Sequence, residues 1–184
     1  MIRSFVACAS AGIAVALTAH GAGVVINATP SMARGVWQRT DQPLARGVVV
    51  IACPPPTATL ELGVARHYLA DGDCPSRSEP LIKPIAAMPG DTVVVRPSGA
   101  IEVNGTLLNN SRSLRNDEGG LPLTGVAACT YTVAPGHVWL ISTYSPLSFD
   151  SRYLGPVPIS SIRGTMGPQS EGLVRAGRPR PSTI

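Results

Sequence analysis

The side chain with the clearest potential for chemistry is Lys83, the only lysine among fifteen basic residues. Arginine stays charged in proteins, whereas a lysine buried in apolar surroundings can lose its proton and act as a base. Lys83 stands in the apolar run 81–87 (LIKPIAA), which would supply such burial. A general bias toward arginine would also leave one lysine by chance, so the count alone does not decide between chemistry and chance.

A serine hydroxyl becomes a nucleophile when a base of this kind lies beside it. The chain has sixteen serines, so only position can distinguish one of them. Ser31 comes five residues after Ile26, where an uncharged apolar segment ends, which would place it close to a membrane face. A serine in an ordinary turn is the simpler alternative for Ser31 on this observation alone.

Histidine is the other common partner of a nucleophilic serine. His67 lies in a segment with helical spacing, and His137 follows Pro135-Gly136 at the start of a predicted strand. Both are expected to be surface or strand-edge residues rather than members of a Ser-His-Asp triad. They show no metal-ligand spacing and the chain has no C-x-x-C, so we predict no metal and no other cofactor.

The N-terminal segment 1–26 has the composition of a signal anchor. No charge occurs between Arg3 and Arg34, and the apolar stretch has about the ~20 residues that a spanning helix needs. A cleaved signal peptide is the alternative, with a small-x-small site within residues 16–22. We expect an anchor. In either case the rest of the chain lies outside the cytoplasm, so the expected location is the inner (cytoplasmic) membrane, with the folded domain on the periplasmic side.

The cysteines are consistent with that compartment. Cys53 and Cys74 bracket an excursion that opens with three prolines, and an oxidising environment permits a disulfide between them. Such a bond would close a loop of roughly twenty residues and contribute on the order of 3 kcal/mol. Cys8, in the apolar segment, and Cys129 are expected to be unpaired.

These residues must be positioned by a single folded domain, which we place at residues 27–166. Eighteen prolines, nineteen glycines and few aromatic residues indicate many turns and short elements. The predicted fold class is therefore all-β and mainly antiparallel. Asn104-Gly105, between residues 101–103 (IEV) and 106–108 (TLL), predicts a type I′ hairpin.

Other elements follow from periodicity. Leu60, Val64 and Tyr68 have helical spacing, which predicts a short helix inside the cysteine-bracketed excursion. Residues 167–184 are rich in Gly, Pro, Ser and Arg and are expected to form a flexible basic tail. Further strands are expected at 47–52, 92–96, 131–133, 137–142 and 157–166.

Three segments together resemble the motifs of the signal peptidase I superfamily. Residues 29–35 (TPSMARG) are similar to its nucleophile box, and residues 83–91 (KPIAAMPGD) are similar to its lysine box. Residues 148–157 (SFDSRYLGPV) are similar to its Ser-x-Asp-Ser-Arg-Tyr-x-Gly box. The Cys-Pro pairs at 53–54 and 74–75 resemble the TraF-type peptidases of conjugative transfer systems in particular.

The resemblance implies a membrane-anchored serine peptidase with Ser31 as nucleophile and Lys83 as general base. A base that works near neutral pH needs a pKa of about 7–8, well below the ordinary lysine value. The backbone N–H of Ser31 and the hydroxyl of Thr29 would hold the oxyanion.

The third box is expected to support this pair. By the resemblance, Ser148 would hydrogen-bond the amine of Lys83 and orient it, while Asp150 and Arg152 would form an ion pair that fixes the box. Residues 142–144 (STY) stand where general signal peptidases have Gly-Asp-Asn. The TraF-type branch also lacks that triplet, which favours a specialised substrate.

The resemblance also implies a substrate class. We expect a pilin precursor or another small membrane protein of a conjugation apparatus, cleaved beside the membrane lipid and then either hydrolysed or cyclised. A general type I signal peptidase is the alternative among enzymes, and a noncatalytic, anchored periplasmic interaction module is the alternative outside them. The net charge of +4 is modest and no basic stripe is interleaved with aromatic residues, so nucleic-acid binding is not expected.

Overall fold

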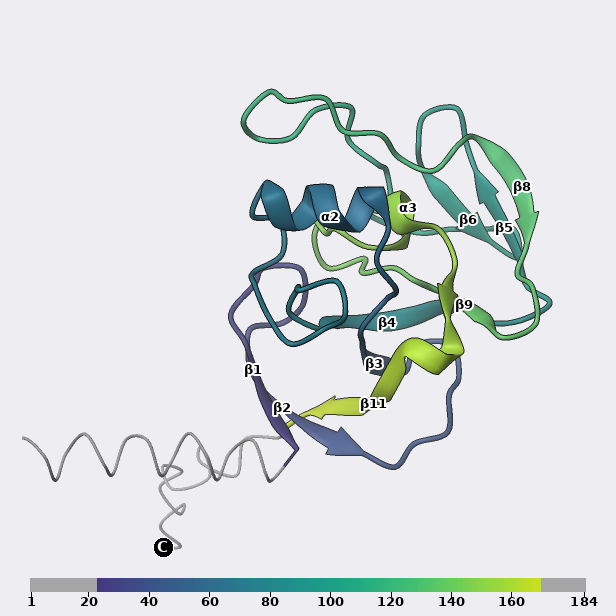
Figure 1. Ribbon diagram of the computed structural model, residues 1–184. Coiled ribbons are helices and arrows are strands. Elements are labelled where there is room, and N and C mark those ends of the chain that lie inside the picture. Colours follow the sequence, from purple (N-terminus) through teal and green to yellow (C-terminus); the bar gives the residue numbers. More distant parts are fainter. Residues whose placement is uncertain (1–22, 170–184) are drawn as a thin grey trace, which may run out of the picture.

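The computed structural model describes residues 23–169, which fold into two antiparallel sheets (Figure 1). One of four apolar clusters contains residues of both sheets and joins them. The predicted all-β, antiparallel class is therefore confirmed for this part of the chain. Within residues 23–169 no helix has the length and apolar character needed to cross a bilayer. Most of the predicted anchor, residues 1–22, lies outside the described residues, as do residues 170–184 of the predicted tail.

The larger sheet has seven strands and carries the N-terminal part of the domain. Its spatial order is β1 (Val24–Asn27), β2 (Gly35–Thr40), β11 (Ile162–Pro168), β3 (Val49–Ala52), β4 (Leu81–Ala87), β9 (His137–Leu140) and β10 (Val157–Pro158). β1 is therefore an edge strand of this sheet, while β4 lies inside it between β3 and β9. The position of β4 explains why its side chains, including that of Lys83, are buried.

The smaller sheet forms the side of the molecule remote from β1 (Figure 1). Its order is β7 (Thr106–Leu107), β6 (Ile101–Val103), β5 (Thr92–Val95) and β8 (Cys129–Thr132). Asn104 and Gly105 join β6 to β7 with φ of 48° and 80°, so the predicted hairpin is confirmed by the two positive φ values that a type I′ turn requires.

Asp91 fixes the turn through which β4 leads into the smaller sheet. Its carboxylate accepts hydrogen bonds from the guanidinium of Arg46, the backbone N–H of Met88 and the amide of Asn104. These donors stabilise the ionised form and hold the pKa of Asp91 well below its usual range, with the Arg46 bond as the largest cause. The Pro-Gly-Asp ending of the lysine box thus has a structural role.

The excursion between β3 and β4 lies over one side of the larger sheet (Figure 1). It contains α2 (Ala58–Ala65), whose first turn is capped by the hydroxyl of Thr57, an acceptor from the Leu60 N–H. Gly63 allows α2 to approach the ring of Phe149 closely, since a Cβ there would lie 2.6 Å from that ring. The predicted helix is confirmed, although it ends before Tyr68.

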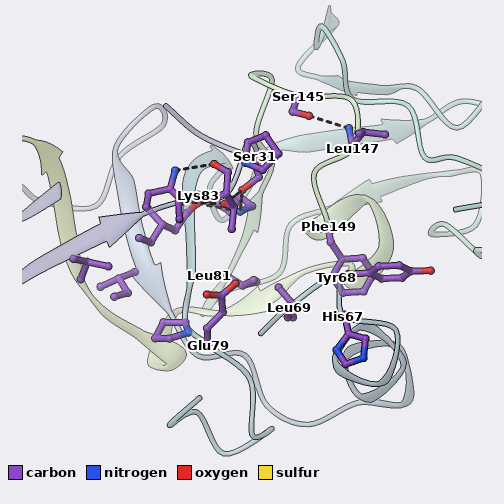
Figure 2. A pocket seen from close by; sticks show the side chains of 18 of the residues that line it. Ser31, His67, Tyr68, Leu69, Glu79, Leu81, Lys83, Ser145, Leu147 and Phe149 are labelled. Atoms are coloured by element: carbon purple, nitrogen blue, oxygen red, sulfur yellow. Dashed lines mark hydrogen bonds between the residues drawn. The ribbon is translucent and has the colours of Figure 1, made fainter. Parts of the chain in front are cut away.

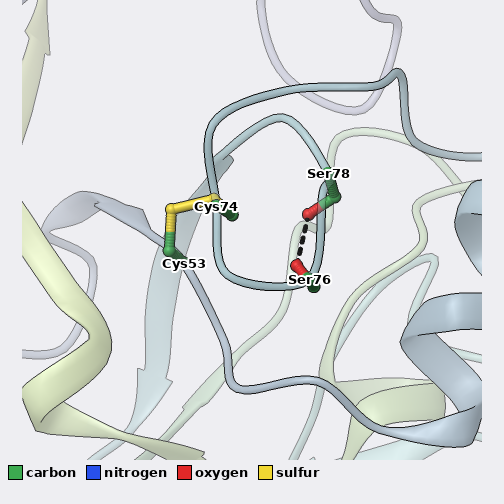
Figure 3. Close-up of a disulfide and its surroundings, with 4 residues drawn as sticks. All are labelled: Cys53, Cys74, Ser76 and Ser78. Atoms are coloured by element: carbon green, nitrogen blue, oxygen red, sulfur yellow. Dashed lines mark hydrogen bonds between the residues drawn. A yellow bond between two sulfur atoms is a disulfide. The ribbon is translucent and has the colours of Figure 1, made fainter.

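A disulfide joins the two ends of the excursion (Figure 3). Cys53, directly after β3, bonds to Cys74 with their Cα atoms 5.3 Å apart, and both side chains are buried. The predicted pairing is therefore the one the structure contains. Cys129 is exposed and has no partner among residues 23–169.

Several element boundaries differ from those predicted. Residues 24–26, assigned to the anchor segment 1–26, belong to β1, where they pair with β2. β2 itself was not predicted, because only Val36 and Trp37 interrupt its polar sequence (GVWQRT). The last strand, predicted at 157–166, is split by a 3₁₀ helix at Ile159–Ser161 into β10 and β11, and β11 continues to Pro168.

We predict that the disulfide is present in exported protein and stabilises the excursion. Alkylation after reduction should label two more thiols than alkylation before it, as read by intact-mass analysis. Replacing Cys53 and Cys74 together by Ser should lower the free energy of unfolding by about 3 kcal/mol, whereas the control Cys129→Ser should leave it unchanged. Free thiols at both positions in exported protein would contradict the prediction.

Candidate active site

The structure brings Ser31 and Lys83 together although 52 residues separate them in sequence. The Nζ atom of Lys83 lies 2.8 Å from the Oγ atom of Ser31 and 3.1 Å from the carbonyl oxygen of Ile82. Lys83 projects from the middle of β4, while Ser31 stands in the turn between β1 and β2 (Figure 2). A base and a nucleophile at hydrogen-bond distance are the minimum that a serine–lysine mechanism requires.

The turn that carries Ser31 is anchored in the core by the next residue, Met32. Met32 is buried in an apolar cluster whose other members come from β2, β3, β4 and β11. Trp37, on β2, belongs to this cluster and donates its indole N–H to the carbonyl of Ala33 at 3.0 Å. Met32 therefore anchors the turn in the core while the neighbouring Ser31 faces the groove.

Burial tunes the amine of Lys83. The residue is only 5% exposed, and desolvation is the main reason why its pKa falls from the ordinary 10.5 to about 8. The carboxylates of Asp150 and Glu79 oppose this fall, and the guanidinium of Arg152 assists it. A pKa near 8 leaves a substantial neutral fraction at mildly alkaline pH, which is the state that a general base requires.

Thr29 lies where an oxyanion donor was expected. Its Oγ1 atom is 2.9 Å from the Oγ atom of Ser31 and 2.9 Å from the side-chain oxygen of Asn27. Asn27, the last residue of β1, was not predicted to take part. A buried amide with contacts to a neighbouring turn has no sequence signature beyond its residue type.

The third box, residues 148–157, contributes a buried ion pair next to the site. Asp150 and Arg152 are wholly buried and paired through two bonds, Nε to Oδ1 at 2.8 Å and Nη2 to Oδ2 at 3.0 Å, which is the predicted ion pair. Asp150 also caps α3 (Ser151–Leu154) by accepting the Arg152 N–H. Removing one partner of such a pair leaves an uncompensated buried charge, at a cost of about 3–5 kcal/mol.

The predicted contact of Ser148 is replaced by another. Its hydroxyl donates to Oδ2 of Asp150 at 2.7 Å, and within residues 23–169 it makes no hydrogen bond to Lys83. The reason is competition, because an ionised carboxylate two residues away is a stronger acceptor than an amine. Ser148 therefore contacts Asp150, whose charge acts on Lys83, rather than the amine itself.

Ser142 links the third box to the turn that carries Ser31, a contact that the sequence did not predict. Its N–H donates to Asp150 at 3.0 Å and its carbonyl accepts from Arg152 at 2.7 Å. Its hydroxyl donates to the carbonyl of Ser31. The position was identified only as a departure from the Gly-Asp-Asn triplet, yet a fully buried serine there ties the ion pair to the turn.

Ser31 and Lys83 open onto a groove of about 1700 Å³. One wall is β1 with the turn after it, and the opposite wall combines the excursion with the loop at residues 114–123. These two segments are joined where Tyr68 donates to Asp117 and Arg66 donates to the carbonyl of Pro122 at 2.8 Å. The volume of this groove exceeds that of a usual small-molecule pocket, which leaves room for a peptide segment beside Ser31.

Neither described histidine is a partner of Ser31. His67 lines the groove but makes no hydrogen bond to Ser31 (Figure 2). Among the described residues, the ring of His137 has one hydrogen-bond partner, the carbonyl of Pro135 at 3.2 Å. The geometry thus favours the lysine over a Ser-His-Asp scheme. In the described part of the chain no three His, Cys, Asp or Glu side chains are grouped so as to hold a metal ion.

Comparison with known proteins agrees with this geometry. The family model described as "Signal peptidase, peptidase S26" matches residues 1–168, nearly the whole chain. The chain belongs to the S26 signal peptidase family. Membership of this family implies a serine peptidase, and Ser31 is the serine that the structure places beside the buried amine of Lys83.

Relatives within the family share most of their length with this chain. A plasmid transfer protein TraF of Escherichia coli is 35% identical over 83% of this chain and 85% of its own. A conjugal transfer protein TraF of Agrobacterium fabrum is 34% identical over 79% and 81%, and a probable conjugal transfer protein TraF of Sinorhizobium fredii is 37% identical over 77% and 74%. A crystal structure of a signal peptidase I from Enterococcus faecalis aligns with 70% of this chain and 100% of its own, at a TM-score of 0.41 and 20% identity.

We predict that Lys83→Met stabilises the fold. Because the folded pKa of Lys83 lies below its unfolded value, protonation favours the unfolded state, so the cost is complete below pH 8 and disappears as pH rises toward 10.5. The variant should gain about 1–3 kcal/mol at pH 7 and much less at pH 10, as measured by urea unfolding. The exposed control Arg34→Met should show no such pH-dependent gain. An equal effect of both substitutions would contradict the assigned burial of the Lys83 amine.

Proposed function

We propose that the chain is a membrane-anchored endopeptidase with a Ser31–Lys83 dyad that processes a pilin precursor, or a similar small membrane protein, in conjugative transfer. The observation that carries the proposal is the 2.8 Å contact between a solvent-accessible serine and the buried amine of the only lysine. The TraF proteins to which the chain is similar support the link to conjugation.

The first chemical step begins with a neutral Lys83. Its amine takes the proton of the Ser31 hydroxyl while Oγ attacks the scissile carbonyl carbon of the substrate. The carbonyl π bond becomes an oxyanion, held by the N–H of Ser31 and the hydroxyl of Thr29. The new ammonium lies near Asp150 and Glu79, whose carboxylates favour the charged form at that moment.

The second step expels the leaving group. As the tetrahedral intermediate collapses, the C–N bond breaks and Lys83 gives its proton to the departing amine. An ester on Ser31 remains, and Lys83 is again neutral and able to activate the next nucleophile. Attack of water on this ester releases a linear product, whereas attack of a substrate amine forms a new peptide bond; both free the hydroxyl of Ser31.

We infer that cyclisation competes with hydrolysis of this ester. An amine can displace water only where it is held against the acyl group, where its effective molarity can reach ~10⁵ M. A substrate whose N-terminus is anchored at the same membrane surface meets that condition. The product would be a ring that joins the new C-terminus to the N-terminus.

The proposed location is the inner membrane, with the groove on the periplasmic side. Two observations support it: the apolar N-terminal segment suits a lipid-embedded anchor, and the Cys53–Cys74 bond suits an oxidising compartment. Ser31 follows that segment closely in sequence, so the dyad would act on substrates at the bilayer surface.

We predict that a fluorophosphonate probe labels Ser31 of the full chain purified in detergent. Peptide mapping by mass spectrometry should find the adduct on Ser31, with a rate that rises with pH around a midpoint near 8 as Lys83 loses its proton. Ser31→Ala and Lys83→Arg should abolish the adduct, because a guanidinium stays charged. Ser145→Ala, in the same groove, should be labelled like the wild type.

Labelling of Lys83→Arg at the wild-type rate would contradict the dyad and leave a noncatalytic or differently activated protein. For the product, a small membrane protein encoded beside this gene can be co-expressed and its mature mass measured. A mass one water below that of the linear cleaved peptide, without a free N-terminus, supports cyclisation. A linear product with both ends free limits the activity to hydrolysis.

A further inference from the structure

Asn27 is a buried polar residue at the start of the turn that carries Ser31. It ends β1 opposite Gly35, where β2 begins, so the turn leaves and rejoins the sheet at this one pair. Its side chain is 7% exposed. The amide nitrogen lies 3.1, 3.2 and 3.0 Å from the carbonyls of Thr29, Met32 and Ala33, respectively. One side chain thus contacts the backbone on both sides of Ser31.

These contacts determine the orientation of the amide. Carbonyl oxygens only accept hydrogen bonds, so the end of the Asn27 amide that faces three of them must be its NH₂ group. Its oxygen therefore faces Thr29, where it accepts from Oγ1 at 2.9 Å and from the backbone N–H at 3.3 Å. A flipped amide would leave the three carbonyls facing an oxygen.

The orientation of the amide directs the proton of Thr29. Because the amide oxygen carries no hydrogen, the bond between Thr29 and Asn27 must use the hydroxyl proton of Thr29. The lone pairs of Thr29 Oγ1 then face Ser31, 2.9 Å away. With Lys83 protonated, its ammonium donates to Ser31 and Ser31 donates to Thr29. When Lys83 becomes neutral, Ser31 turns its proton to the amine, while Thr29 keeps its own proton on Asn27.

We propose that Asn27 is a positioning residue that keeps the Thr29 proton off the Ser31 nucleophile until an oxyanion forms. A Thr29 hydroxyl that donated to Ser31 would occupy a lone pair that must attack the substrate. With its proton on Asn27, Thr29 leaves that lone pair free, and rotation about its C–O bond then brings the proton to the oxyanion. This inference rests on the proposed Ser31–Lys83 dyad.

Asn27→Asp is the sharpest test, because it keeps the shape, removes both amide donors and adds a negative charge. The charged groups that already act on Lys83 are Asp150 and Glu79, which favour its ammonium form, and Arg152, which opposes it. A carboxylate at position 27 would add to the first two. The labelling rate should therefore fall about tenfold or more, and its pH midpoint should move upward.

The experiment compares fluorophosphonate labelling of Ser31 across pH in the full chain for the wild type, Asn27→Asp and the exposed control Asn109→Asp. The control should match the wild type. Unfolding midpoints measured in parallel show whether each variant is folded. A wild-type rate and an unshifted midpoint in folded Asn27→Asp would overturn the proposal. Absence of labelling in the wild type would instead refute the dyad itself.

A second pair of variants keeps the test decisive if Asn27→Asp does not fold. Thr29→Ser retains the hydroxyl that Asn27 orients, and Thr29→Val removes it at similar volume. Thr29→Ser should be labelled within about threefold of the wild-type rate, and Thr29→Val about tenfold or more below it. The combined loss in Asn27→Ala with Thr29→Val should be clearly smaller than the product of the two single losses. Equal rates for the two Thr29 variants, or independent multiplication of the two losses, would overturn the proposal.

Discussion

The contact between the buried amine of Lys83 and the hydroxyl of Ser31 is the central interaction of the site. An ammonium inside a sheet is unfavourable, and the shift of the pKa from 10.5 to about 8 corresponds to about 3 kcal/mol of differential stabilisation between the two protonation states. The domain tolerates this cost because β4 lies between two other strands and its apolar neighbours are packed on both sides. In the proposed mechanism, the same burial that weakens the fold supplies a neutral amine that can act as a base.

A second constraint, under the proposed mechanism, is that the hydroxyl of Ser31 must reach the amine of Lys83 while staying accessible from the groove. The turn after β1 achieves this through an apolar anchor, Met32, and through polar contacts to its backbone from Asn27 and Ser142. Ser142 in turn is held by Asp150 and by Arg152, so this buried ion pair helps to position Ser31 through Ser142. The hydrogen bonds of Ser142 therefore connect the buried ion pair to the backbone of Ser31.

The sequence predicted those parts of the site that reside in contiguous motifs. Ser31, Lys83 and the Asp150–Arg152 pair lie in three recognisable boxes, and the structure brings the boxes together. The predicted hydrogen bond of Ser148 to Lys83 was wrong. Whether this hydroxyl bonds to the amine or to the carboxylate of Asp150 depends on distances that the sequence does not contain. Ser142 and the participation of Asn27 were missed for a related reason: each acts on backbone carbonyls, which have no residue identity to recognise.

Strand assignment followed the same division. The hairpin at Asn104-Gly105 and the apolar strands were predictable, since turn chemistry and hydrophobic runs are local signals. β2 was not, because it is mostly polar and is held by its neighbours β1 and β11 rather than by its own composition. The 3₁₀ helix at Ile159–Ser161 was also missed. It connects β10 and β11, which are not neighbours in the sheet, so it depends on the tertiary structure rather than on local sequence.

The central claim, that burial makes Lys83 a base, can be measured directly because the chain has a single lysine. Protein labelled with [ε-¹³C]lysine should give one lysine Cε signal in an NMR spectrum of the full chain in detergent, and its chemical shift can be followed from pH 6 to pH 12. We predict a titration midpoint of about 8. A midpoint at the ordinary value of 10.5 would contradict the account, because such an amine would be almost fully protonated at the pH where the enzyme is expected to act.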